Sequence, residues 1–202
     1  MLDTRVRQHI DPVLDAIGHG LASRGISANT VTVVGFLLGG VAAFLIVQQA
    51  YWWALAILLL SRTCDGLDGA VARAANKKTD YGGFLDIVLD FAFYGLIPTA
   101  FIIANPADNG VAGAVLLLTF YVNGASFLAY ALMAEKRGLE ETDRGSKSLL
   151  YTTGLAEATE TICVFVAFCL FPNWFSEIAW VFAIVVAYTT FSRIMLAQKA
   201  FE

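Results

Sequence analysis

Charged residues are scarce in this sequence, and their scarcity excludes several classes of protein. Of its 202 residues, 15% are charged and 58% are hydrophobic, with a mean hydropathy of +0.67. A soluble domain carries about 25% charged and about 45–50% apolar residues. The surplus apolar residues lie in long runs, which is typical of an integral membrane protein. No basic patch or tail of the kind that binds nucleic acid is present, so we expect no nucleic-acid partner.

Histidine and cysteine are also rare. The two histidines, His9 and His19, both lie near the N-terminus, and the spacing of the three cysteines matches no zinc motif. We therefore expect neither a zinc site nor a disulfide framework. The cysteines are better explained as small apolar residues within or beside the apolar runs.

Six apolar stretches have the length of membrane-spanning helices. They cover approximately residues 30–49, 51–75, 82–104, 111–134, 151–171 and 176–197. Residues 4–24 precede them, place apolar side chains on one helical face and are too polar to span, which predicts an amphipathic helix at the membrane surface. We expect one all-α integral membrane domain over residues 1–202, with a juxtamembrane helix over 1–25 and a six-helix bundle over 26–202.

Local signals and positive charges refine this prediction. Gly25 is placed to end the first helix, and Ser27 or Asn29 can cap the next one. All 13 Lys and Arg residues fall in the segments that six spans would place on one side together with both termini. Cytoplasmic segments are enriched in Lys and Arg. The sequence therefore predicts a multi-pass membrane protein with both termini in the cytoplasm.

Four aspartates interrupt the apolar pattern on the predicted cytoplasmic side. Asp65 and Asp68 are three residues apart, and Asp86 and Asp90 are four apart, so each pair shares one face of its helix. A short polar loop joins the two helices, which can therefore turn both acidic faces toward each other. Ionisable residues beside or within a bilayer are costly and by default indicate function.

Four carboxylates at one place would repel one another unless cations bind among them. Oxygen ligands without nearby histidine or cysteine favour Mg²⁺ or Mn²⁺, with Ca²⁺ as an alternative. Small residues, Gly69, Ala72 and Gly82, keep helical step with the acids and leave room for a bulky ligand. Arg73, on the same helix as the first pair, can help two such ions to stabilise a diphosphate. The alternative is a solvated loop in which the acids pair with Arg62, Arg73, Lys77 and Lys78, but it leaves the small residues unexplained.

The same residues resemble a known signature, that of the CDP-alcohol phosphotransferases. The signature reads Asp, two residues, Asp-Gly, two residues, Ala-Arg, eight residues, Gly, three residues, Asp, three residues, Asp. Its eight positions keep every spacing here, as Asp65, Asp68, Gly69, Ala72, Arg73, Gly82, Asp86 and Asp90. Chain length and span number fit as well, whereas Ala28 stands where many members have proline.

The resemblance implies a metal-dependent transfer of a phosphatidyl group from CDP-diacylglycerol to a polar alcohol, with release of CMP, in phospholipid biosynthesis. Asp65, Asp68 and Asp86 would bind two Mg²⁺ or Mn²⁺ ions. Asp90 would complete the metal site and act as the base on the acceptor hydroxyl. The CDP moiety would contact Gly69, Ala72, Arg73, Gly82, Asn29 and Thr32. Membrane lipids surround members of this family, which are typically homodimers. The sequence resembles a bacterial inner-membrane subgroup of the family, which implies a bacterial inner membrane as its location.

The motif does not identify the acceptor alcohol. Polar residues in the later spans and in the polar loop of residues 135–147 are candidates for its pocket. Glu157, Glu160 and Arg193 lie in the predicted spans, and Lys147 and Arg144 lie in the loop. The two glutamates share a helical face and would either bind the acceptor or pair with an arginine inside the bundle. A phosphorylated acceptor would need the basic residues, and an unphosphorylated polar alcohol is slightly favoured.

Two other functions fit an acidic site in a membrane protein. An intramembrane Mg²⁺-dependent prenyltransferase also binds a diphosphate, but it normally has more spans and two separated aspartate motifs. A cation transporter would place its acids near the middle of the bilayer, with a path to the opposite side. Here the acids lie in one compact motif at the basic side, which disfavours both alternatives.

Overall fold

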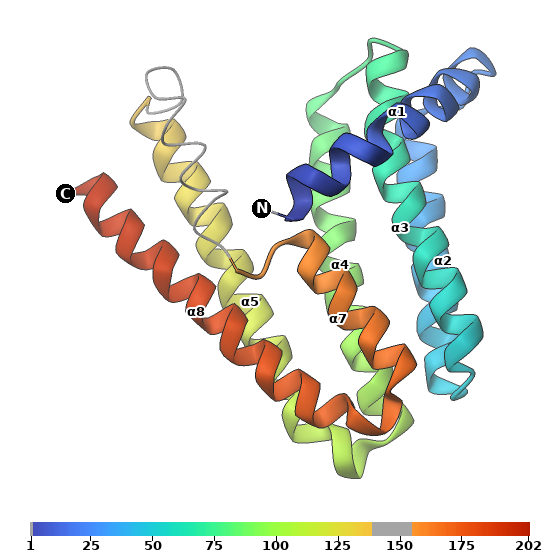
Figure 1. Ribbon diagram of the computed structural model, residues 1–202. Coiled ribbons are helices and arrows are strands. Elements are labelled where there is room, and N and C mark those ends of the chain that lie inside the picture. Colours follow the sequence, from blue (N-terminus) through green and yellow to red (C-terminus); the bar gives the residue numbers. More distant parts are fainter. Residues whose placement is uncertain (1, 139–154) are drawn as a thin grey trace.

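The fold is entirely helical in the part of the chain that the structure describes. The computed structural model describes residues 2–138 and 155–202, with side chains from residue 12 onward (Figure 1). The helices are α1 (Leu2–Ser23), α2 (Ala28–Val47), α3 (Tyr51–Ala74), α4 (Asp80–Ala104), α5 (Pro106–Lys136), α7 (Ala158–Leu170) and α8 (Phe175–Phe201), with a 3₁₀ turn, η1, at Pro172–Trp174. This arrangement confirms the predicted all-α class.

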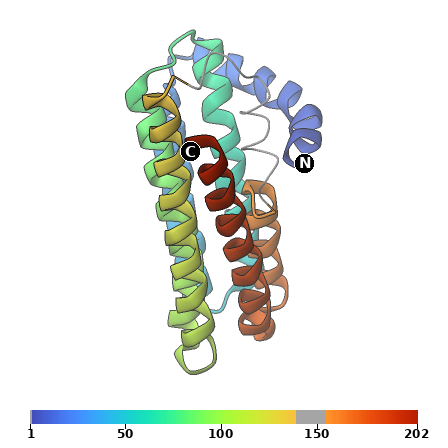
Figure 2. The ribbon, with the colours of Figure 1, turned by 90° about the vertical axis from the view of Figure 1, so that its left-hand side faces the viewer.

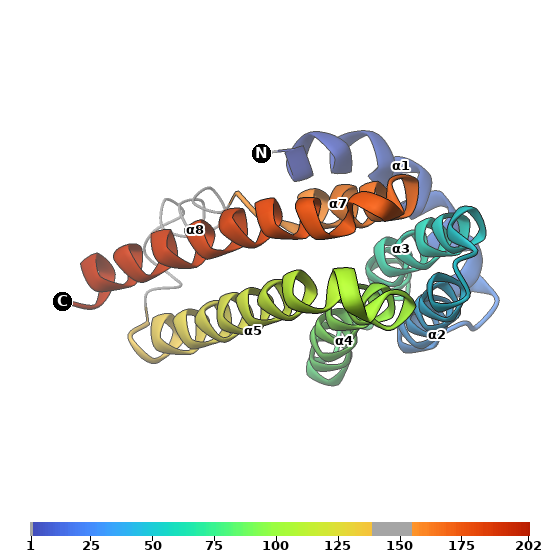
Figure 3. The same ribbon diagram turned by 90° about the horizontal axis from the view of Figure 1, so that it is seen from below.

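The long helices form a bundle in which each packs on its neighbours. α2 lies along α3 and α4, whereas α5 and α8 pack along each other. α4 contacts α5, and α7 contacts both α3 and α8, so these contacts join the two groups (Figures 2 and 3). α1 crosses over α3 near the loop between α3 and α4 (Figure 1).

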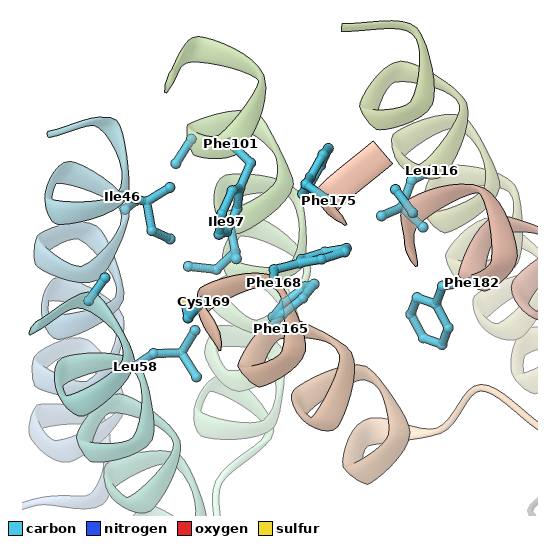
Figure 4. Close-up of a cluster of buried hydrophobic side chains, with 14 of the residues drawn as sticks. Ile46, Leu58, Ile97, Phe101, Leu116, Phe165, Phe168, Cys169, Phe175 and Phe182 are labelled. Carbon is cyan, nitrogen blue, oxygen red and sulfur yellow. The ribbon is translucent and has the colours of Figure 1, made fainter. Parts of the chain in front are cut away.

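Aromatic side chains fill the centre of the bundle. Phe101 from α4, Phe165 and Phe168 from α7 and Phe175 from α8 are fully buried (Figure 4). Phe93 from α4 belongs to the same cluster and is fully buried as well. The ring centroids of Phe168 and Phe175 are 4.5 Å apart. Aromatic rings bury large areas and gain further from tilted or edge contacts. This cluster therefore fixes α4, which carries two of the four aspartates, against α7 and α8.

Four helices are long and apolar enough to cross a membrane, out of the residues that the structure describes. These are α2, α4, α5 and the segment Pro172–Phe201. α3 has 24 residues, but its second half contains the charged motif. α7 has 13 residues, about 20 Å at 1.5 Å per residue, which is shorter than a hydrocarbon layer of about 30 Å. The helix that the structure shows within the predicted fifth span, 151–171, is thus shorter than that span.

α1 is a helix as predicted, and its local signals act as expected. Gly25 has a positive φ of 78° just beyond the end of the helix, and Ser27 caps α2 by accepting a hydrogen bond from Thr30 N. The predicted single apolar face is divided, because Leu14 is buried against α3 whereas Val13 is 59% exposed. The location of α1 at a membrane surface stays a prediction.

Candidate metal and nucleotide site

Three of the four predicted metal ligands lie together where α3 meets α4. Carboxylate oxygens of Asp65, Asp86 and Asp90 all lie within 4.8 Å of one another. The short loop between α3 and α4 brings the pairs together, and Thr79 starts α4 by accepting a hydrogen bond from Gly82 N at 3.1 Å. A set of carboxylate oxygens fits Mg²⁺ or Mn²⁺.

Asp68, the fourth predicted ligand, lies one turn away and has a different partner. Its side chain accepts a hydrogen bond of 2.6 Å from the Thr32 hydroxyl of α2, and the residue is 8% exposed. Thr32 was predicted to contact the CDP moiety, and in the structure it also orients Asp68. The carboxylate of Asp68 retains a second oxygen for an ion or a ligand.

A cavity of about 370 Å³ adjoins the acids, which is within the usual range for small-molecule sites. Its lining includes all six residues predicted to contact the CDP moiety: Asn29, Thr32, Gly69, Ala72, Arg73 and Gly82. Asp68 and Asp86 also line it. Asp86 therefore belongs both to the cavity and to the group of three carboxylates.

Two glycines shape this cavity in different ways. A Cβ atom at Gly82 would lie 3.1 Å from both Asn29 Oδ1 and Thr79 Oγ1, so the backbone there is already closely packed. A Cβ atom at Gly69 would meet only Arg73 Nη1, at the ordinary contact distance of 3.5 Å. Gly69 thus leaves open space for a ligand rather than for another part of the protein.

Arg73 connects the cavity to α1. Its Nη2 atom lies 2.7 Å from Asp15 Oδ1, and both side chains are about half exposed. α1 can approach because Gly18 has no side chain: a Cβ atom there would lie 2.9 Å from Ala70 Cβ. The predicted role of Arg73 at a diphosphate thus acquires a partner, Asp15, that the sequence analysis did not identify.

Arg62 is the functional candidate that sequence reasoning missed. From the sequence, Arg62 was considered only as one of several basic residues that could pair with the acids in a solvated loop. The structure shows this pairing for Arg62, but on a buried face of α3 and not in a solvated loop. Its side chain is 8% exposed, and its Nη1 lies 2.9 Å from Asp90 Oδ1 and 3.3 Å from Asp65 Oδ1. Its position three residues before Asp65 on one helix was the available signal.

The predicted acceptor residues occupy three kinds of place. Arg193 of α8 donates to Asn123 Oδ1 at 2.8 Å and Ser126 Oγ at 2.7 Å, both on α5. Glu157 and Glu160 form the capping box at the start of α7, with Glu157 N donating to Glu160 Oε2 at 3.3 Å. They therefore lie at a helix end and not within a span. Lys147 and Arg144 lie outside the described residues.

Comparison with known sequences identifies related proteins over nearly the whole chain. The model of the CDP-alcohol phosphatidyltransferase family matches residues 25–191. The Inner membrane protein YnjF of Escherichia coli is 45% identical over 194 residues, which cover 96% of this chain and 94% of that protein. An archaetidylinositol phosphate synthase of Pyrococcus horikoshii is 39% identical over 87 residues, 43% of this chain and 46% of that protein.

Solved structures share the fold. The phosphatidylinositol phosphate synthase of Mycobacterium tuberculosis with CDP-DAG bound superposes with a TM-score of 0.68 and 17% identity, covering 92% of this chain and 94% of that chain. The same enzyme in complex with manganese and citrate gives a TM-score of 0.67 at 18% identity, over 92% and 88% of the two chains. At these identities the likeness shows the fold alone.

Proposed function

The chain belongs to the CDP-alcohol phosphatidyltransferase family, a family of membrane enzymes of phospholipid synthesis, and from this premise we propose how its site works. The chain transfers a phosphatidyl group from CDP-diacylglycerol to an alcohol and releases CMP, with divalent metal ions as cofactors. The prenyltransferase and cation-transporter alternatives are set aside, because the family model covers residues 25–191, which include the whole acidic motif.

One observation carries the proposal: the acids and the cavity share Asp86. A cytidine nucleotide in the cavity would contact Asn29, Gly69 and Gly82, and its diphosphate would extend toward Asp86. Small side chains on the cavity wall suit close approach of the nucleotide to the helix backbone. Arg73, at the same cavity, supplies a positive charge for the diphosphate.

The carboxylates fit the proposed metal cofactor. Asp65, Asp86 and Asp90 would hold Mg²⁺ or Mn²⁺, with Asp68 as the further ligand of a two-ion site. When bound, such ions neutralise negative charge on the diphosphate and on the leaving phosphate. The structural neighbour solved with manganese supports this choice of ion.

The reaction that we propose is a direct displacement at the lipid-side phosphorus. The acceptor hydroxyl loses its proton to the Asp90 carboxylate while its oxygen forms the new bond to phosphorus. The bond from that phosphorus to the bridging oxygen of the diphosphate breaks, and CMP leaves with the electron pair. Phosphoryl transfer depends mainly on positioning and charge stabilisation, which this cluster of side chains can provide.

For the acceptor, we propose a phosphorylated cyclic polyol such as inositol phosphate, in place of the unphosphorylated alcohol that the sequence slightly favoured. By name, one relative is an archaetidylinositol phosphate synthase, and the structural neighbour is a phosphatidylinositol phosphate synthase. Arg193 is the basic group that supports this choice, since it lies inside the α5–α8 pair with its guanidinium held by Asn123 and Ser126. Whether Glu157, Glu160, Lys147 and Arg144 contribute stays a prediction.

The placement in the membrane is also proposed. α3 and α7 pack among the four helices that can span, and although α7 alone is shorter than the hydrocarbon layer, we propose that the chain crosses a bacterial inner membrane six times as one domain of residues 1–202. The distribution of Lys and Arg supports a cytoplasmic site and cytoplasmic termini. The family resemblance supports a homodimer.

A single assay tests the function. Purified protein with Mg²⁺ or Mn²⁺ and labelled CDP-diacylglycerol should release CMP when inositol phosphate is added, and more slowly with inositol, glycerol 3-phosphate or serine. If no alcohol, water included, elicits metal-dependent CMP release, the proposal is wrong. A prenyl diphosphate consumed instead of CDP-diacylglycerol would restore the prenyltransferase alternative.

A further inference from the structure

Arg62 makes direct contacts with two carboxylates of the site, although it lies outside the family signature. Its Nη1 atom lies 2.9 Å from Asp90 Oδ1 and 3.3 Å from Asp65 Oδ1. An Nη1 group carries two hydrogens, so one can serve each carboxylate. Nη2 donates to Ser61 Oγ at 3.3 Å, and Ser61 in turn donates to Gly35 O at 2.7 Å. The guanidinium of Arg62, a residue of α3, thus links α3 to α4 beside the acids.

The guanidinium also rests on a rigid support. Its central carbon lies 3.6 Å from the centroid of the Phe93 ring, and Phe93 is fully buried. Phe93 packs directly on Gly39 of α2, where a Cβ atom would lie 2.6 Å from the ring. A cation on a desolvated aromatic face is held more firmly than one at an exposed face. The position of Arg62 is therefore fixed by Phe93 of α4, which itself packs on α2.

Stability alone does not account for a buried arginine at this position. Its Nε atom is buried and has no hydrogen-bond partner among the residues that the structure describes, which is costly. Replacing buried ion pairs by apolar residues is often neutral or stabilising. This cost is explained if the positive charge of Arg62 is needed to hold the carboxylates of Asp65 and Asp90.

We propose that Arg62 is a positioning residue, an internal cation that holds one oxygen of Asp65 and one of Asp90 and leaves their other oxygens to the metal ion and the acceptor hydroxyl. The proposal rests on the proposed function. It makes Arg62 a counter-charge of the acidic site that is present before any ligand arrives. Because like charges repel, the same guanidinium also weakens the attraction of the site for divalent cations.

These two effects predict opposite changes when the charge is removed. In Arg62→Met, Mn²⁺ alone should bind about tenfold more tightly, because a nearby positive charge is lost. Its kcat should fall about 100-fold or more, because Asp90 is no longer held, while KM for CDP-diacylglycerol stays within about threefold. Arg62 does not line the nucleotide cavity, which is why KM should change little.

A second variant separates charge from geometry. Arg62→Lys keeps the charge but cannot serve two carboxylates from one planar group. Its affinity for Mn²⁺ should stay within about threefold of the wild-type value, with kcat reduced about tenfold or more. Arg24→Met, at an exposed arginine in the turn between α1 and α2, is the matched control and should change neither quantity.

The experiment uses the full chain in detergent, with Mn²⁺ binding followed by electron paramagnetic resonance and turnover by CMP release. A kcat for Arg62→Met within threefold of wild type overturns the proposal. Parallel losses of Mn²⁺ affinity, turnover and thermal stability also overturn it, because they indicate a merely structural residue. If the wild-type protein releases no CMP, the proposed function fails, whereas the Mn²⁺ titrations still test the role of Arg62.

Discussion

Two regions of the bundle differ in how they present polar groups. The nucleotide half, helices α2 to α4, has an acidic group beside a cavity with small-residue walls. The α5–α8 pair carries a basic group, Arg193, enclosed by the polar atoms of Asn123 and Ser126. Under the proposed function, donor and acceptor would be recognised by separate helices. Changes in the first region should therefore affect every substrate, and changes in the second should affect the acceptor alone.

The largest effect in the nucleotide half is expected when the charge of Asp90 is removed. In Asp90→Asn, kcat should fall about 10³-fold or more, because the acceptor hydroxyl loses its base, while CDP-diacylglycerol still binds. CMP release and nucleotide binding measured on one preparation check this. Asp80→Asn, at the exposed first turn of the same helix, is the control. Loss of all nucleotide binding would instead make Asp90 an essential ligand.

A smaller effect is expected from filling the cavity. Gly69→Ala adds a methyl group that meets no clash in the protein but occupies ligand space, so CDP affinity should fall about 10–100-fold. The midpoint temperature of thermal unfolding should stay unchanged or rise, because alanine has a higher helix propensity than glycine. Gly95→Ala, on α4 with open space around it, should leave CDP affinity unchanged. Titration of CDP followed by calorimetry distinguishes them, and equal behaviour of the two variants would contradict the cavity assignment.

The α5–α8 pair is tested by Arg193→Gln. We expect KM for inositol phosphate to rise about tenfold or more, because a charge-assisted contact to phosphate is lost. KM for CDP-diacylglycerol should stay constant. Lys199→Gln, at the exposed end of α8, is the control. A rise in both KM values would show that the two regions are not separate.

The smallest effect should follow Asp15→Asn. The ion pair between Asp15 and Arg73 is about half exposed, and such pairs contribute roughly 0–1 kcal/mol. CDP affinity should fall about twofold, because Arg73 loses its anchor on α1. A double-mutant cycle with Arg73→Gln measures the coupling. A coupling energy well above 1 kcal/mol would show that α1 is an integral part of the nucleotide site.

The nucleotide half could be predicted from sequence because its geometry is local. Asp65 and Asp68 share a face by helical spacing, and a short loop returns Asp86 to the same place. Asn29 and Thr32 followed from the family resemblance, and both line the cavity.

Other parts depended on contacts that spacing does not encode. The role of Arg62 requires Asp90 and Phe93 from another helix, and Arg193 finds Asn123 across 70 residues of sequence. The glutamates were misplaced because α7 begins only at Ala158, so that Glu157 caps the helix instead of lying inside a span. The sequence also predicted six membrane-spanning helices, whereas helix length and composition support four among the described residues.

The position of Asp86 in both the cavity and the carboxylate group has a thermodynamic consequence. Under the proposed function, a cation at the carboxylates would reduce the repulsion between Asp86 and an incoming diphosphate, so the two ligands would bind cooperatively. By linkage, the factor by which the ion tightens the nucleotide equals the factor by which the nucleotide tightens the ion. Each ligand would therefore bind more tightly in the presence of the other, and CMP and metal would leave more readily once one of them has gone.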